Sequence, residues 1–188
     1  MGIEFPSQMG LVNAALREGL GDAPASGSDD PRQVVQTMVE GFDRIYETLL
    51  QSNPWRFSMK KRAAQQLEFE PVNEYRYAFQ IPTDCLMLRG VWPLLTDYEV
   101  YGDRIYTNTK PIDLEYQYKI EVGAIPAYFS TLLVCHLALA GARMATGKEG
   151  VVAEVKDRIK MVLPIAQYAD AQARPNKRIH DPYAAGNR

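Results

Sequence analysis

The chain has 188 residues, of which 46% are hydrophobic and 23% charged, and its formal net charge at pH 7 is -2. These ordinary values argue against wholesale disorder, and the small net charge gives no overall attraction to nucleic acid or to an anionic membrane. The length suits one folded unit with a good-sized core, or a compact domain that carries an inserted subdomain.

The first third of the chain predicts two helices joined by a loop. Ser7 is the expected N-cap of a helix that continues through Glu18. The segment 22–30, DAPASGSDD, consists of loop-forming residues and predicts a flexible surface connection. Asp30 is then the expected N-cap of a second helix that reaches Ser52.

The second helix has the clearest apolar pattern in the chain. Its large apolar side chains recur every three or four residues, at Val35, Met38, Phe42, Ile45 and Leu49. Such a narrow stripe lies on one face of a helix and is suited to packing against another helix. We therefore expect this stripe to be buried.

Strand patterns fill the middle third of the chain. Alternation of apolar and polar residues, or a continuous apolar run, predicts strands at 67–69, 75–81, 85–92, 98–101, 104–107 and 112–119. The run Cys85–Trp92 is apolar on both faces, which predicts a central strand. Gly102 and Asp103 predict a tight hairpin turn. We expect these strands to form an antiparallel sheet.

The last third predicts a helical hairpin. The segment Ala127–Ala145 is apolar around most of its circumference, but His136 and Arg143 interrupt it, and its uninterrupted apolar part is too short for a membrane span. We expect a buried helix of a soluble protein. The segment 148–172 predicts a second helix, which Pro164 should kink.

These elements predict an α+β fold. Its N- and C-terminal helices form a helical bundle, an antiparallel β-sheet is inserted between helix 2 and helix 3, and an extended arm follows. The predicted boundaries are 1–53 for the N-terminal helices, 54–122 for the inserted sheet, 123–173 for the C-terminal hairpin and 174–188 for a partner-binding arm.

No residue pattern in the chain indicates catalysis. His136 has no Cys, Asp or Glu three or four residues after it, so a packing histidine is favoured over a metal ligand. His180 falls in the arm, where a surface contact is favoured over catalysis. Cys85 and Cys135 belong to no metal-binding spacing and are expected to be free thiols. We therefore predict no catalytic, cofactor-binding or metal-binding residue, and no cofactor.

A basic run follows the second helix and has two interpretations. Its cations are Arg56, Lys60, Lys61 and Arg62. They could contact nucleic-acid phosphates while Trp55 and Phe57 stack on bases. We favour the interpretation that Trp55, Arg56 and Phe57 anchor the junction between helices and sheet, because no recognition helix or RNA-binding signature accompanies them.

The order of these features resembles a known family, the head-to-tail adaptor proteins of tailed bacteriophages, in particular the tail tubular protein A group. The matching segments are LVNAALREGLG, SNPWRFSMKKRA, IPTDCLMLRGVW, YEVYGDRIYTN and LEYQYK, in that order, followed by two helices and a polar arm. The similarity spans nearly the whole chain. Each segment alone has little specificity, and the weight lies in their order and spacing.

The resemblance implies a non-enzymatic structural protein of the virion. Members of the family form rings, typically dodecameric, that join the portal to the tail nozzle or tail tube, and double-stranded DNA passes through the ring without sequence-specific binding. The implied location is the neck or tail of the virion after synthesis in the host cytoplasm, without membrane contact. The implied portal-binding residues are those of the arm: Arg174, Lys177, Arg178, Ile179, His180, Tyr183 and Arg188. A nucleic-acid-binding accessory protein and a small hydrolase of unknown class are the alternatives.

Overall fold

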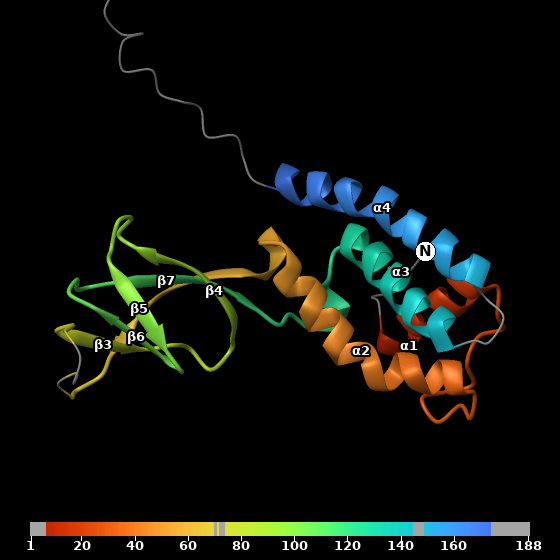
Figure 1. The fold of residues 1–188 in the computed structure, drawn as a ribbon, viewed down its shortest axis with the longest axis horizontal. Helices are drawn as coiled ribbons and strands as arrows, with labels where there is room; N and C mark the ends of the chain where they lie inside the picture. The colour runs from red at the N-terminus through yellow and green to blue at the C-terminus, as the bar shows by residue number, and fades with distance from the viewer. Residues whose placement is uncertain (1–6, 70, 72–73, 145–148, 174–188) are drawn as a thin grey trace, which may run out of the picture.

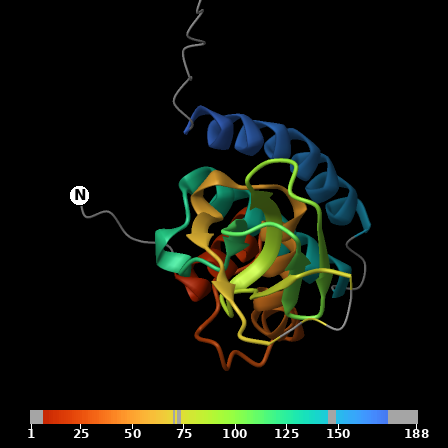
Figure 2. The same cartoon turned by 90° about the vertical axis from the view of Figure 1, so that its left-hand side faces the viewer.

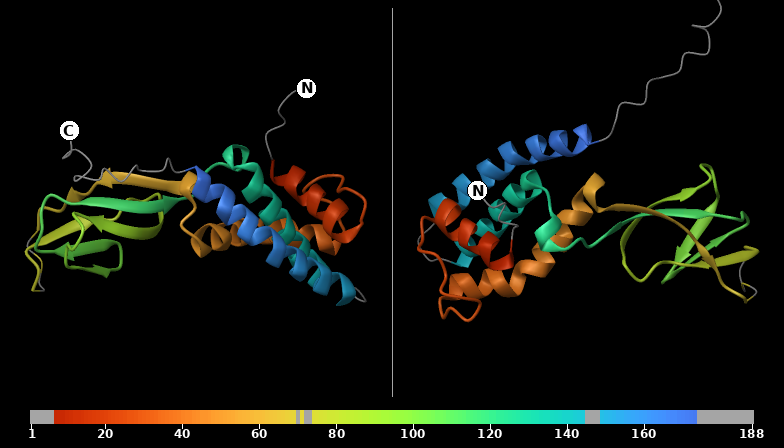
Figure 3. Two further views of the ribbon diagram at one scale, coloured as in Figure 1. Left: turned by 90° about the horizontal axis from the view of Figure 1, so that it is seen from above. Right: turned by 180° about the vertical axis from the view of Figure 1, so that it is seen from behind.

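The structure, a computed structural model, describes residues 7–69, 71, 74–144 and 149–173, so the predicted arm lies outside the described residues. Helices lie at one end of an elongated molecule and strands at the other (Figure 1). The views from above and from behind show the same division (Figure 3). The prediction of a mixed α+β protein with antiparallel strands is confirmed, although the described strands form two sheets instead of one.

The helical end is built from two segments that are far apart in the sequence. Its α-helices are α1 (Gln8–Ala14), α2 (Gln33–Ser52), α3 (Ala127–Met144) and α4 (Glu149–Gln172). The Ser7 hydroxyl accepts a hydrogen bond from the Gly10 amide at 3.0 Å, which confirms the predicted cap of α1. A π-helical turn, η1 (Ala15–Leu20), extends α1 and ends at Gly21, whose φ of 66° suits glycine.

Helix α3 packs against α1, η1, α2 and α4. The approach is close, because a Cβ at Gly19 would lie 2.3 Å from the Ala138 Cβ, and one at Gly141 would lie 2.3 Å from the Met38 Cε. By length and composition α3 could cross a membrane, but half of it is buried, as in a core helix. The largest fully buried side chains of this end are Trp55, Tyr46, Phe42, Phe129, Leu16, Met38, Leu50 and Leu132.

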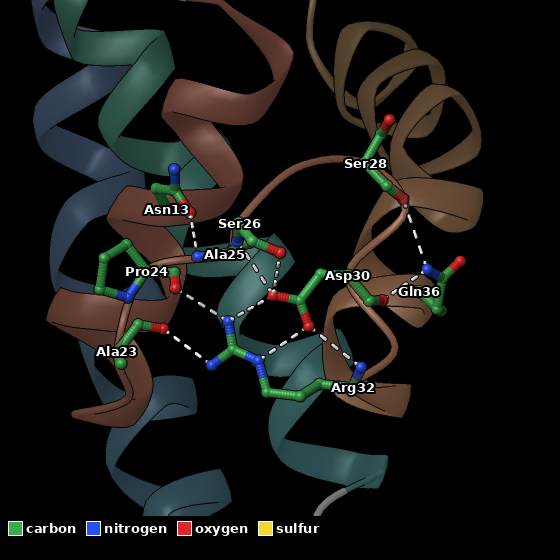
Figure 4. Close-up of polar contacts among 9 residues, drawn as sticks. All are labelled: Asn13, Ala23, Pro24, Ala25, Ser26, Ser28, Asp30, Arg32 and Gln36. Atoms are coloured by element: carbon green, nitrogen blue, oxygen red, sulfur yellow. Dashed lines mark hydrogen bonds and ion pairs between the residues drawn. The ribbon is translucent and has the colours of Figure 1, made fainter.

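The segment 22–30 is held in place by Asp30, which is only 5% exposed (Figure 4). Its carboxylate accepts hydrogen bonds from the Ser26 amide at 3.0 Å and from the Arg32 amide at 3.0 Å, and it pairs with the Arg32 guanidinium at 2.9 Å. These bonds, with that of the guanidinium first, hold the pKa of Asp30 far below its usual range. The predicted capping role of Asp30 is wrong, because α2 begins at Gln33 and Asp30 organises the preceding loop instead.

The strand end contains two antiparallel sheets. The described strands are β1 (Met59–Ala63), β2 (Gln65–Gln66), β3 (Tyr77–Gln80), β4 (Cys85–Trp92), β5 (Tyr98–Tyr101), β6 (Arg104–Thr107) and β7 (Asp113–Tyr118), and the turn η2 (Arg56–Ser58) precedes them. One sheet has the order β1-β7-β4, and the other has the order β2-β3-β6-β5. In the view from this end, the strands lie in front of the helices (Figure 2).

Three strand predictions need correction. No strand is predicted from the sequence at the basic segment that includes Lys60 and Lys61, but this segment is strand β1 and pairs with β7. Strand β4 lies at an edge of its sheet, and β7 is the central strand, because β7 pairs on both sides. The weak alternation at 67–69 gives no strand, whereas Gln65–Gln66 pairs with β3 as β2.

A small core joins the two sheets. Its buried members are Phe79, Val91, Ile105, Ile112, Leu114 and Tyr116. Strand β1 runs into β2 through Ala64, whose amide donates to the Ile112 carbonyl at 2.9 Å, so adjacent residues serve both sheets. The predicted hairpin of β5 and β6 is confirmed, with Gly102 at its turn in a left-handed conformation of φ 61°. This core is separate from that of the helical end.

Candidate functional site at the junction of helices and sheets

Trp55 lies where the chain passes from α2 to β1. Its side chain is fully buried, and its indole Nε1 donates to the Leu49 carbonyl at 2.8 Å, which satisfies one of the free carbonyls at the end of α2. Its ring packs edge to face against the Phe129 ring, with 5.2 Å between the ring centroids. The Phe57 ring also packs against the Phe129 ring, with 4.9 Å between the centroids. The tryptophan thus joins the end of α2 to the start of α3.

Asp170 connects the end of α4 to the same junction. It is 3% exposed, and its carboxylate accepts hydrogen bonds from the Arg56 backbone amide at 2.9 and 3.0 Å and from the Tyr128 hydroxyl at 2.8 Å. Burial, followed by the bond to Asp170, raises the pKa of Tyr128, so the hydroxyl keeps its proton and remains a donor. One carboxylate therefore holds η2, α3 and α4 together.

Gln117 connects strand β7 to the end of α2. Its amide nitrogen lies 3.0 Å from the Leu50 carbonyl and 2.9 Å from the Asn53 carbonyl, and its side chain is fully buried. Its amide oxygen accepts a hydrogen bond from Arg89 at 2.7 Å, and Arg89 also donates to the Gln51 carbonyl at 2.7 Å. The three-stranded sheet is therefore attached to the end of α2 by hydrogen bonds, of which the one from Gln117 to Leu50 is buried.

The return crossing from β7 to α3 is held in a similar way. The Tyr46 hydroxyl donates to the Ile120 carbonyl at 2.8 Å, and Lys119 pairs with Asp43 at 2.8 Å and with Glu47 at 2.9 Å. Hydrogen bonds to the two carboxylates raise the pKa of Lys119. Both chain crossings between the two ends are thus fastened by polar contacts, which favours one orientation of the sheets relative to the helices.

The structure brings the predicted junction residues together. Trp55 and Phe57 pack on α3, and the Arg56 backbone binds Asp170. Sequence reasoning missed Asp170 and Gln117. The alternation in 112–119 would put Gln117 on the solvent face, and no sequence signal showed that the end of α2 covers it.

The other predicted residues lie outside this junction. The predicted portal-binding residues Arg174, Lys177, Arg178, Ile179, His180, Tyr183 and Arg188 lie outside the described residues. In the part of the chain that the structure describes, no three His, Cys, Asp or Glu side chains form a group that could hold a metal ion. Cys135 is buried and Cys85 half-buried, and both are free thiols.

The basic strand β1 carries compensated charges. Lys60 pairs with Asp84 at 2.8 Å and lies 3.6 Å from the ring centre of Tyr118. Lys61 pairs with Asp113 at 3.6 Å and lies 4.5 Å from the ring centre of Trp92. The acids and rings beside them already engage these cations, which reduces what they could offer to phosphate groups.

His136 lies in a groove between α2 and α4. This α2–α4 groove has a volume of about 310 Å³, and its lining residues are Arg44, Ile45, Thr48, Leu49, Ser52, His136, Ile159 and Leu163. Burial lowers the pKa of His136 below its ordinary value of 6.5, so its ring is neutral at pH 7. The inside of the groove is therefore apolar and uncharged, and Arg44 stands at its edge.

Among the described residues, the most exposed large apolar side chains lie at two other places. Leu94 and Leu95 lie in the loop between β4 and β5, where Leu95 has a positive φ of 73°. Met161, Ile165 and Tyr168 lie on α4. Exposed apolar groups of this size are typical of surfaces that bind other proteins.

Comparison with known proteins gives no family for the chain. Neither a scan against protein-family models nor a search of curated proteins finds a match.

Proposed function

We propose that this chain is a structural protein of a phage virion, a head-to-tail adaptor that forms a ring, joins the portal to the tail and lines part of the DNA passage. In this proposal the helices form a bundle that faces the neighbouring copies, and the sheets, inserted between α2 and α3, contribute to the ring. The arm of residues 174–188 engages the portal. The order of sequence features that resembles the adaptor family is the starting point of the proposal.

One structural observation carries the proposal. The helical end and the strand end both carry exposed apolar side chains, and hydrogen bonds to two buried side chains join these ends. Asp170 and Gln117 anchor the helices and the sheet to the same turn of chain. A subunit that must hold its position between two different neighbours benefits from such a junction, because hinge motion would carry an entropic cost on assembly. Exposed apolar groups on α4 and on the β4–β5 loop supply area for contacts with other proteins.

The proposed partners are further copies of the chain, the portal protein, and a tail nozzle or tail tube protein. The proposal includes no cofactor and no chemical step. Double-stranded DNA would pass through the ring lumen without base-specific contacts. The proposed location is the neck or tail of the virion.

Removal of the arm tests the proposed portal contact. A chain that ends at Ala173 should lose binding to purified portal while its far-ultraviolet circular dichroism and melting temperature stay unchanged. A full-length chain with the residues of 174–188 in scrambled order is the matched control, because it keeps the charge and length of the arm. Unchanged portal binding by the shortened chain would contradict the assignment of the arm.

The ring itself is tested by the mass of native particles and by electron images of the protein with portal. A closed ring between portal and tail is the expected image. Of the alternatives, the nucleic-acid-binding protein predicts DNA binding that weakens steeply with salt. The ion pairs of Lys60 and Lys61 do not favour it. No specific observation favours the small hydrolase.

A further inference from the structure

The solvent-facing side of α4 carries an apolar stripe. Met161, Ile165 and Tyr168 are 63%, 65% and 68% exposed, and we call them the α4 stripe. Their spacing of four and then three residues places them on one face of the helix. Anchors at this spacing are those with which an amphipathic helix fills an apolar groove.

The α2–α4 groove lies on the other side of the same helix. At 100° per residue, Ile159 and Leu163 of the groove lie roughly opposite the α4 stripe around the axis of α4. One molecule thus presents a helical ridge on one side and an apolar groove on the other. When the ridge of one copy enters the groove of the next copy, the groove of the first copy and the ridge of the second both remain free for further copies.

The ridge and the groove are similar in length. The α2 wall of the groove extends from Arg44 to Ser52, and the α4 stripe extends from Met161 to Tyr168. The wall is one residue longer than the stripe, and the two spans correspond to about 12 Å and about 10 Å of helix. The groove therefore has room along its axis for all three side chains of the stripe.

The direction of the helices is also compatible with repetition. Helix α2 is antiparallel to α3, because Trp55 after its end lies beside Phe129 at the start of α3. Helix α4 is antiparallel to α3 as well, because Asp170 near its end binds Tyr128. Helices α2 and α4 are therefore parallel. If neighbouring copies are related by rotation about an axis parallel to these helices, the α4 of one copy is also parallel to the α2 and α4 that form the groove of the next copy.

The charges at one end of this contact are complementary. In such a parallel arrangement, Asp157, one turn before Met161, comes to the end of the groove where Arg44 stands. No ion pair of Arg44 is found within the described residues, and Asp157 is held only by Lys160 in an exposed pair at 2.8 Å. Exposed pairs of this kind contribute little, so exchange of Asp157 to a new partner costs little.

We propose that the α4 stripe of one copy docks in the α2–α4 groove of the next copy, with Asp157 facing Arg44. The two surfaces differ, so the contact is head-to-tail and generates a ring or a filament instead of a closed dimer. This inference rests on the proposed function, since it assigns the contact between copies of the proposed ring.

A single charge on the stripe tests the contact. In sedimentation velocity over a concentration series, Ile165→Glu of the full chain should raise the apparent dissociation constant by at least about thirtyfold, because it places a carboxylate in the apolar groove. The control is Val100→Glu, since Val100 is also an exposed apolar residue, at 44%, but lies on β5 at the strand end. Val100→Glu should leave the association unchanged, and both variants should keep the wild-type circular dichroism.

Charge reversal tests the orientation. Arg44→Glu alone and Asp157→Lys alone should each weaken the association by about threefold to tenfold, and the double variant should restore most of the loss. Rescue requires that the two side chains meet, and within one chain they lie on different helices with no contact between them in the described structure.

The outcomes separate this inference from the proposed function. If the wild type associates and Ile165→Glu associates equally well, the α4 stripe is not the contact, and the proposed ring uses another surface. Loss of association without rescue in the double variant would overturn the orientation. A wild-type chain that stays monomeric at about 100 μM, both alone and on portal, would overturn the inference and the proposed function together.

Discussion

The helical end and the strand end of this molecule are stabilised in different ways. At the helical end, α3 is surrounded by other helices, and at Gly19 and Gly141 there is no room for a Cβ. At the strand end, the core is small, and lysines such as Lys60 and Lys61 lie over aromatic rings at the surface. Densely packed side chains cannot shift to accommodate a substitution, whereas partly exposed side chains can adopt other conformations. Equivalent substitutions should therefore cost more at the helical end.

The largest contrast is expected between the two tryptophans. Trp55→Ala should reduce the free energy of unfolding by about 3 to 5 kcal/mol, because it removes a fully buried ring and leaves a cavity against Phe129. Trp92→Ala at the half-buried strand end should cost only about 1 kcal/mol. Urea denaturation of both variants measures the difference. An unaltered melting temperature for Trp55→Ala would show that this side chain does not hold the junction.

The close approach of η1 to α3 should be nearly as sensitive to added volume. Gly19→Ala should destabilise the fold by about 1 to 3 kcal/mol, because its Cβ would lie 2.3 Å from the Ala138 Cβ. The control is Gly41→Ala on α2, where the nearest atom, Ile45 Cδ1, is 3.6 Å away. That variant should be more stable by about 0.4 to 1 kcal/mol, because alanine loses less chain entropy on folding. Equal melting temperatures would refute the close contact.

The junction between the two ends should respond to loss of a single amide. Gln117→Leu should cost about 1 to 3 kcal/mol, because the Leu50 and Asn53 carbonyls lose a donor and Arg89 loses an acceptor. Gln66→Leu, on exposed strand β2, serves as the control and should change the free energy of unfolding by less than about 0.5 kcal/mol. A Gln117 variant as stable as wild type would mean that the amide does not attach the sheet to α2.

The effect expected at Asp30 depends on pH. Its folded pKa lies below the unfolded value of about 3.9, so the carboxylate stabilises the fold above that pH. This contribution is lost as the pH falls from about 4 through the folded pKa. Asp30→Asn should be less stable than wild type at pH 7, and the difference should shrink below pH 4.

Urea titrations between pH 2 and 7 measure this convergence. Asp84→Asn at the strand end is the comparison, because hydrogen bonding to Lys60 lowers the pKa of Asp84 too, but both partners are largely exposed. Its effect should be smaller. A constant gap between wild type and Asp30→Asn down to pH 2 would mean that the Asp30 pKa is not lowered in the folded state.

Local patterns predicted most of the elements. Apolar spacing found α2 and α3, and alternation found β7 and the β5–β6 hairpin, because each depends on which side of a segment meets the core. The patterns failed where a distant segment decided the environment. Asp30 has the sequence context of a cap but folds back onto Ser26 and Arg32. The basic strand β1 has no apolar pattern, because its position is set by backbone pairing with β7.

The candidate site was predicted in part. The aromatic residues Trp55 and Phe57 beside a proline marked the junction, since large rings at a change of pattern indicate an anchor. Their polar partners could not be predicted, because Asp170 is 114 residues from Arg56 in the sequence.

The sequence by itself determined most of the helices and strands and that both kinds of element are present. Only the tertiary structure decided that the strands divide into two sheets, that Gln117 is buried, and that α4 leaves an apolar stripe on its outer side. Periodicity records how a segment meets its nearest surface. Burial at a junction depends on a second surface that arrives from elsewhere in the chain, and no local pattern carries that information.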